Sequence, residues 1–204
     1  MATKNNHAPK PKPRKEPATY HDAVFTAFRY ILREYVENGD ITLQDERRLS
    51  KQPLKIDIMI IKKKRDVDIE TSWGKIFRGH NIIEYKSPAD SLVSLSVFNK
   101  VIHGYTGVYA SQENVSLTDM SATIVCFKRP VELFETLKSE LNYKILCKDK
   151  GIYYILQKGA VVEKSLAIQV LVSSELPDSD VALKELKKKF DKAARVKIAE
   201  FIRN

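Results

Sequence analysis

The chain carries two strand-length apolar stretches, Leu54-Lys55-Ile56-Asp57-Ile58-Met59-Ile60-Ile61 and Ile82-Ile83-Glu84-Tyr85-Lys86. β-Branched residues dominate both stretches, so we expect two buried β-strands. Each stretch has charged residues in its middle, where burial is costly unless the charge is paired or bound to a metal. Because strand side chains alternate between faces, Glu84 and Lys86 are expected to share one face of their strand.

These charged residues indicate a specific chemistry. An aspartate on one strand, followed by an acid and a lysine on one face of the next, is what metal-dependent phosphodiester cleavage requires. Carboxylates bind the divalent ion, and the ammonium lies beside the attacking water or the developing phosphorane charge. Purely structural alternatives remain open: Asp57 could cap a turn or pair with a nearby lysine, and Glu84 with Lys86 could form an ordinary ion pair.

Composition limits the classes of protein to consider. A length of 204 residues fits one domain plus tails, and 43% hydrophobic residues suffice for a real core. The formal net charge of +9 favours a polyanionic partner, nucleic acid ahead of an anionic membrane surface. No apolar run is long enough to span a bilayer, and the polar, basic N-terminus does not look like a secretory signal. Cys126 and Cys147 lie in apolar runs and are expected to be reduced core thiols of a cytoplasmic protein.

Three segments are expected along the chain. Residues 1–18 are rich in lysine and proline and predict a disordered basic arm, which could strengthen phosphate contact or be a plain solubilising tail. Residues 19–175 should form the folded domain. Residues 176–204 are expected to add an amphipathic helix that could follow phosphates, dock a partner helix or simply present a solvated face.

The hydrophobic patterns predict an α/β fold, a mixed β-sheet flanked by helices with a core order αβββαβ. The first three strands could form an antiparallel meander, and the long central helix suits a crossover between parallel strands. The expected elements are helices at 20–36, 91–109, 131–140 and 180–203 and strands at 41–47, 54–62, 67–70, 81–86, 122–127, 143–147, 152–156 and 166–172.

The stretch from Leu49 to Pro88 resembles the PD-(D/E)xK nuclease superfamily. It is most similar to the bacterial branch of recombination-promoting nucleases and transposase-related proteins, with its pattern LSK-x-x-L-x-ID-x-x-IIKK followed by IFRGHNIIEYKSP. The resemblance covers roughly residues 20–175 and implies a restriction-endonuclease-like core. Ile56 stands where the family name has proline, and the second helix lacks the Gln-x-x-x-Tyr pair of RecB-like members.

The resemblance also implies the site residues. Asp57 and Glu84 would be metal ligands for Mg²⁺ or Mn²⁺, and Lys86 the catalytic lysine. A further acid, Glu46 or Glu34, would complete the site, with Glu46 slightly preferred. Lysine and arginine residues in turns and on the second helix are the candidates for nucleic-acid binding: Lys62, Lys63, Lys64, Arg78 and Lys100.

Aromatic and histidine residues offer weaker candidates. Trp73 and Phe77, on an expected loop, could stack on bases or pack onto the core. His80 and His103 are expected to be surface or hydrogen-bonded residues rather than metal ligands.

These observations predict a cytoplasmic, Mg²⁺-dependent hydrolase that cleaves phosphodiester bonds in DNA. The main alternative is a catalytically inactive protein of the same fold that binds nucleic acid or protein partners. The expected partner is nucleic acid, with DNA as the first choice, and not a membrane; a homodimer is left open.

Overall fold

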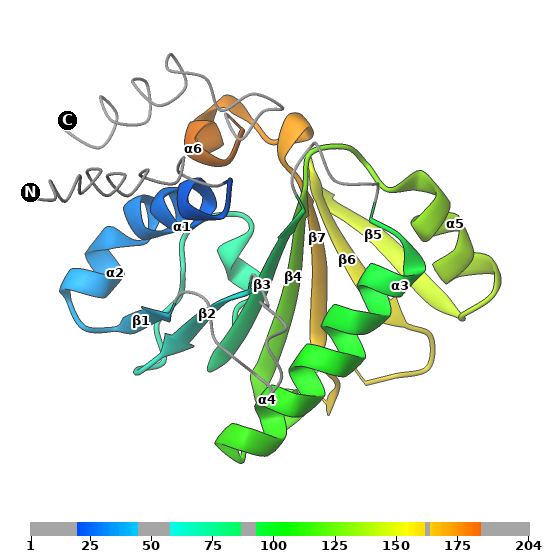
Figure 1. The fold of residues 1–204 in the computed structure, drawn as a ribbon, viewed down its shortest axis with the longest axis horizontal. Helices are drawn as coiled ribbons and strands as arrows, with labels where there is room; N and C mark the ends of the chain where they lie inside the picture. The colour runs from blue at the N-terminus through cyan, green and yellow to red at the C-terminus, as the bar shows by residue number, and fades with distance from the viewer. Residues whose placement is uncertain (1–19, 45–57, 87–92, 162–163, 185–204) are drawn as a thin grey trace, which may run out of the picture.

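The computed structural model describes residues 20–44, 58–86, 93–161 and 164–184 (Figure 1). The expected basic arm and the acids Asp57 and Glu46 lie outside these ranges. So does most of the expected C-terminal helix, of which α6 (Val181–Lys184) is described. Among the described helices, none has the length and apolar character needed to cross a membrane.

A seven-stranded mixed sheet forms the centre of the molecule, in the order β1-β2-β3-β4-β7-β6-β5. Parallel pairing joins β3 to β4 and β4 to β7, and antiparallel wings flank this centre on both sides. The α/β class, the antiparallel meander and the parallel crossover are therefore confirmed. The strands are β1 (Ile41–Gln44), β2 (Ile58–Lys63), β3 (His80–Lys86), β4 (Met120–Cys126), β5 (Tyr143–Asp149), β6 (Ile152–Gln157) and β7 (Ala167–Val172).

Helices cover both faces of this sheet (Figure 1). One face carries α1 (Tyr20–Ile31), α2 (Arg33–Glu37) and α6, and the other carries α5 (Val131–Ser139) and a long crossover helix. The crossover helix consists of α3 (Leu95–Asn99), a π-helical segment (Lys100–Tyr105) and α4 (Thr106–Glu113).

The core is divided between the two faces because side chains on each strand alternate. Ile58, Ile60 and Ile82 pack beneath the crossover helix and α5. Met59 and Ile83, one position along their strands, pack beneath α1 and α6. Every residue of β4 and of β7 is buried, as expected for parallel strands covered on both faces.

The structure corrects two expectations. No strand forms at 67–70: Ile69 buries its side chain under α1, but the segment joins no ladder of the described sheet. Cys126 is a buried thiol as expected, whereas Cys147 is exposed because it lies on the edge strand β5.

The crossover helix also differs from its expected bounds. It begins at Leu95, where the Ser94 hydroxyl accepts a hydrogen bond from the Val97 amide at 3.3 Å. It continues to Glu113, and Asn114, with φ of 54°, ends it in the left-handed conformation.

The outer strand β5 is irregular. Its register with β6 shifts between Cys147 and Asp149, which marks a bulge. Lys144 and Lys148 on this strand are exposed.

Candidate functional site

Glu84 lies near the carboxyl end of β3, between β2 and β4. It pairs in register with Ile58 on one side and Ile124 on the other, and the whole residue is only 4% exposed. Its side chain shares a face with Ile82, the face beneath the crossover helix. The apolar residues around Glu84 predict a strand at this position. The fold buries the Glu84 carboxylate together with these apolar neighbours.

Lys86 forms the partner of this buried acid. Its Nζ lies 2.7 Å from Oε1 of Glu84, and its side chain is 24% exposed against 5% for that of Glu84. The pair is therefore asymmetric, with a buried carboxylate and an ammonium that reaches the surface. This is the shared face that the period of two in a strand predicts for these residues.

The remaining acids of the expected site divide into two groups. Asp57 and Glu46 lie outside the described residues, although Asp57 is the residue immediately before β2. Glu34 is exposed on α2, a helix that packs on the face opposite to that of Glu84. The structure therefore does not bring Glu34 to Glu84.

The chemical type of the donor atoms, carboxylate oxygens, fits a magnesium or manganese ion. The Glu84 carboxylate is a hard oxygen ligand, the kind that these ions prefer, and the residue is only 4% exposed. Within the described part of the chain, no group of three or more His, Cys, Asp or Glu side chains could hold a metal. Asp57 and Glu46, outside the described ranges, remain the predicted additional ligands.

Most of the residues expected to bind nucleic acid lie at the opposite end of β3. Lys62 pairs in register with His80, the first residue of β3, and Lys63 and Lys64 follow it. A seven-residue strand places this end roughly 20 Å from Lys86. Lys100 is exposed on the π-helical segment, with its Nζ 5.1 Å from the centre of the Tyr105 ring.

Two of these cations already have structural contacts. The Nζ of Lys62 lies 2.6 Å from Oε2 of Glu113, a hydrogen bond that raises the pKa of the lysine. The Nη1 of Arg78 donates to the main-chain carbonyls of Thr118 at 2.7 Å and Ser165 at 2.5 Å. Both side chains thus tie together segments that are far apart in the sequence.

The aromatic candidates belong to the core. Trp73 is completely buried, with its ring centre 5.1 Å from that of Phe28 and 5.6 Å from that of Phe77. Phe77 is buried too, so these two rings pack in the core and are not exposed for stacking on bases. His80 is half-buried, and its Nδ1 lies 2.8 Å from the Tyr109 hydroxyl. Burial lowers the pKa of His80 below its usual value.

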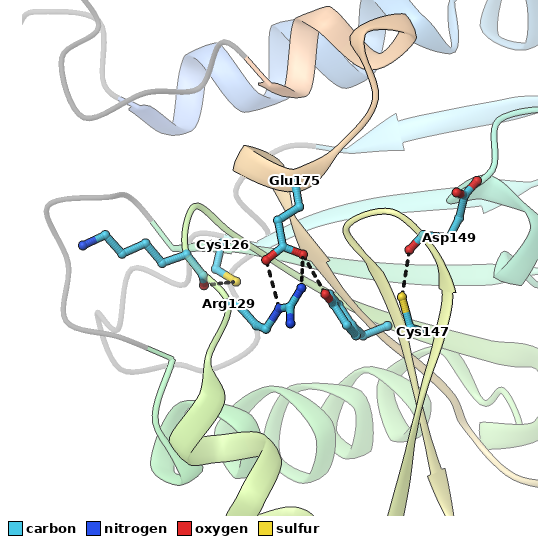
Figure 2. A network of polar contacts seen from close by, with 7 residues as sticks. Cys126, Arg129, Cys147, Asp149 and Glu175 are labelled. Carbon is cyan, nitrogen blue, oxygen red and sulfur yellow. Dashed lines mark hydrogen bonds and ion pairs between the residues drawn. The ribbon is translucent and has the colours of Figure 1, made fainter.

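A polar network at the carboxyl ends of β4 and β7 was missed by the sequence analysis (Figure 2). Arg129 holds Glu175 through two parallel hydrogen bonds, Nε to Oε1 at 2.9 Å and Nη2 to Oε2 at 3.0 Å. Tyr153 donates to Oε2 of Glu175 at 2.6 Å, and the Arg129 guanidinium lies 5.1 Å from the centre of its ring. Both charged residues follow parallel strands, the position where α/β sheets gather polar groups, and this could have identified them.

The network lies at the same edge of the sheet as Lys86. Cys126, the last residue of β4, pairs in register with Lys86, and its thiol interacts electrostatically with Glu175. Burial raises the pKa of this thiol to about 12, so Cys126 stays protonated and unreactive. Glu84, Lys86 and the Arg129–Glu175 pair thus all belong to the carboxyl end of the parallel centre.

The chain matches no known family model, no curated protein and no solved structure.

Proposed function

We propose that this chain is a metal-dependent nuclease of the PD-(D/E)xK type that hydrolyses phosphodiester bonds in DNA. The observation that carries the proposal is Glu84, an acid only 4% exposed within a central strand and paired with Lys86 at 2.7 Å. Burial of a carboxylate costs several kcal/mol unless a partner or a metal offsets it. A fold that places such an acid beside a surface-reaching lysine has the charges that phosphodiester hydrolysis needs.

The order of elements supports the same proposal. Helix α1 is followed by β1, β2 and β3, then by the crossover helix and β4. The first three strands are antiparallel and β4 is parallel to β3. This αβββαβ arrangement is the one that a restriction-endonuclease-like core requires, with the acid and lysine on its third strand.

Each residue has a distinct role in the proposed reaction. Asp57 and Glu84 would hold the ion, which would supply Lewis-acid activation of the phosphate and of the attacking water. Lys86 places a positive charge beside the phosphate oxygens, held in position by Oε1 of Glu84. The half-exposed Arg129, oriented by Glu175, supplies a second fixed cation at the same edge of the sheet.

The basic residues at the other end would contact the backbone away from the cleaved bond. A separation of roughly 20 Å along β3 corresponds to about six base pairs of a duplex at 3.4 Å per step. Lys63 and Lys64 would therefore strengthen binding along the DNA rather than act on the scissile phosphate. Lys100, exposed on the crossover helix, would add a further backbone contact.

Nicking of supercoiled plasmid in Mg²⁺ or Mn²⁺ tests the proposal. We expect nicking by the wild type and its loss in Asp57→Asn, Glu84→Gln and Lys86→Ala. Glu113→Gln is the matched control, because it also removes the carboxylate of a lysine–glutamate pair, the one that joins α4 to β2.

The outcomes separate the alternatives. Equal nicking by all variants would identify a contaminant and contradict the proposal. Binding of DNA without nicking in either metal would favour the inactive, nucleic-acid-binding alternative. Loss of nicking in Glu113→Gln as well as in Glu84→Gln would show that the assay reports stability rather than chemistry.

A further inference from the structure

The guanidinium of Arg129 has a donor edge that no described residue occupies. A guanidinium carries its N–H donors in a rigid plane. The Glu175 carboxylate takes the edge formed by Nε and Nη2, with contacts of 2.9 and 3.0 Å. Among the residues that the structure describes, none accepts a hydrogen bond from Nη1. The Arg129 side chain is 50% exposed, so the edge formed by Nη1 and Nη2 is open to a ligand.

The plane of this guanidinium is held from two directions. Glu175 fixes its rotation within the plane, and Figure 2 shows the two side chains facing each other. The centre of the Tyr153 ring lies 5.1 Å from the guanidinium carbon, and Phe134 packs against that ring with the ring centres 5.1 Å apart. The Tyr153 hydroxyl also donates to Oε2 of Glu175 at 2.6 Å. The direction of the open edge is therefore set by the protein before any ligand binds.

Arg129 lies near the proposed catalytic lysine along the edge of the sheet. Lys86 and Cys126 pair in register as the last residues of β3 and β4, which places them about 5 Å apart. Arg129 follows Cys126 by three residues, a length of chain that spans at most about 11 Å. The backbones of Lys86 and Arg129 are therefore within about 16 Å of each other, or about five steps of a duplex at roughly 3.4 Å per step.

We propose that the Nη1–Nη2 edge of Arg129 binds a backbone phosphate of the DNA substrate, within about five nucleotides of the cleaved bond, and that Glu175 and Tyr153 position it. This inference rests on the proposed nuclease function. Two parallel donors match two phosphate oxygens, a geometry that arginine provides and lysine does not. Because Glu175 cancels the formal charge of Arg129, the contact depends on direction at short range rather than on long-range attraction.

Glu175→Gln separates orientation from charge, because the two roles predict opposite signs. If Arg129 acted only through its charge, loss of the Glu175 carboxylate would leave that charge uncompensated and DNA would bind more tightly. If Glu175 orients the guanidinium, its loss weakens binding. We expect the Kd for DNA to rise about threefold to tenfold in Glu175→Gln. Tyr153→Phe keeps the ring and every charge and should raise Kd about twofold to fivefold.

Fluorescence anisotropy with a labelled DNA duplex measures Kd, without divalent metal and at one fixed salt concentration. Arg129→Gln is expected to raise Kd about tenfold, and Arg129→Lys should recover little of this loss. Arg33→Gln is the matched control, because the Arg33 guanidinium also lies 5.4 Å from the centre of a tyrosine ring, that of Tyr30. It belongs to α2, which leads into β1 beside Lys63, at the end of the sheet remote from Lys86. This variant should bind DNA within about twofold of the wild type.

Plasmid nicking in Mn²⁺ gives a readout that a merely structural role would not produce. Arg129→Gln should raise KM about tenfold and lower kcat by less than about threefold, because the contact binds substrate away from the reacting phosphate. Thermal unfolding is measured for each variant. A fall in both kcat and the unfolding temperature with no rise in KM would assign these contacts to fold stability and overturn the inference.

The outcomes distinguish this inference from the proposed function. Nicking by the wild type, with Kd and KM unchanged in Arg129→Gln, would overturn the inference and leave the nuclease function intact. No nicking by the wild type, with weaker DNA binding in Arg129→Gln but not in Arg33→Gln, would end the nuclease function and retain the phosphate contact. Unchanged or tighter binding in Glu175→Gln would refute the positioning role; if that variant does not fold, unchanged binding in Tyr153→Phe refutes it instead.

Discussion

Two lysine–glutamate pairs of almost equal length mark opposite ends of the β2–β3 ladder. Lys86 lies 2.7 Å from Glu84, and Lys62 lies 2.6 Å from Glu113. The lysines are equally accessible, 24% and 25% exposed, but the carboxylates differ: that of Glu84 is 5% exposed and that of Glu113 is 21%. Distance therefore does not distinguish the two pairs, and burial of the acid does.

The difference arises from where each acid is placed. Glu113 ends a helix at the surface, where water still solvates it, so the pair joins α4 to β2 at little cost. Glu84 lies inside a central strand, where water cannot compensate it. Only the second arrangement holds a carboxylate in a position that a metal ion could exploit.

The largest effect should come from metal binding. Glu84→Gln is expected to weaken Mn²⁺ binding by at least about a hundredfold, because the buried ligand loses its charge. Glu113→Gln should leave the affinity unchanged. Calorimetric titration with Mn²⁺ measures both, and equal affinities in the two variants would break the distinction between the two ends.

Stability should differ next. Lys86→Met leaves the buried Glu84 without its lysine and is expected to lower the free energy of unfolding by about 1–3 kcal/mol. Lys62→Met removes the more solvated pair and should cost only about 0–1 kcal/mol. Urea unfolding at neutral pH compares them, and a larger loss in Lys62→Met would reverse our ranking of the two pairs.

The two ends should also respond to acid at different pH. Burial lowers the pKa of His80 below its usual value of about 6.5, so its contribution to stability is complete above that pH and is lost as pH falls through the folded pKa. For Glu175, burial acts to raise the pKa, but hydrogen bonds from Arg129 and Tyr153 outweigh it and the pKa is lowered. Its contribution is therefore complete above about pH 4.3 and is lost at lower pH.

Urea midpoints measured across a pH series test this order. His80→Gln should flatten the profile as pH falls below about 6.5, and Glu175→Gln only as pH falls below about 4.3. A change of slope in the same pH window for both variants would contradict the assignment.

The smallest expected difference between the two regions concerns the reactivity of the two thiols. In the native protein we expect only the exposed Cys147 to react, because Cys126 is buried beside Lys86 with a pKa of about 12. Mass spectrometry after treatment with iodoacetamide counts the labels, with Cys147→Ser as the control. Modification of that variant under native conditions would show that the Lys86 end of the sheet is less tightly packed than described.

The periodicity of the strands could be predicted from sequence, and the shared face of Glu84 and Lys86 followed from it. The strand expected at 67–70 failed because Val67 and Ile69 alternate as a strand does, yet only tertiary packing decides whether a backbone finds a ladder partner. The first residue of the crossover helix could not be predicted, because Ser94, which caps it, is one of several residues in this segment that could cap a helix.

The partners of the basic residues could not be predicted. Lys62 reads as part of a basic run, but its partner Glu113 is 51 residues away, brought there by the crossover helix. Arg78 is anchored by a carbonyl 87 residues away. Such contacts depend on the whole topology, so the sequence indicates charge and leaves open whether that charge is available to a ligand.

The irregular outer strand β5 has a consequence for assembly. A flat sheet border invites the backbone of another molecule to add a strand, the first step toward amyloid-like growth. The bulge between Cys147 and Asp149 bends this border, and the exposed Lys144 and Lys148 give it a positive charge that repels a second copy of itself. This border is thereby protected against aggregation through its backbone.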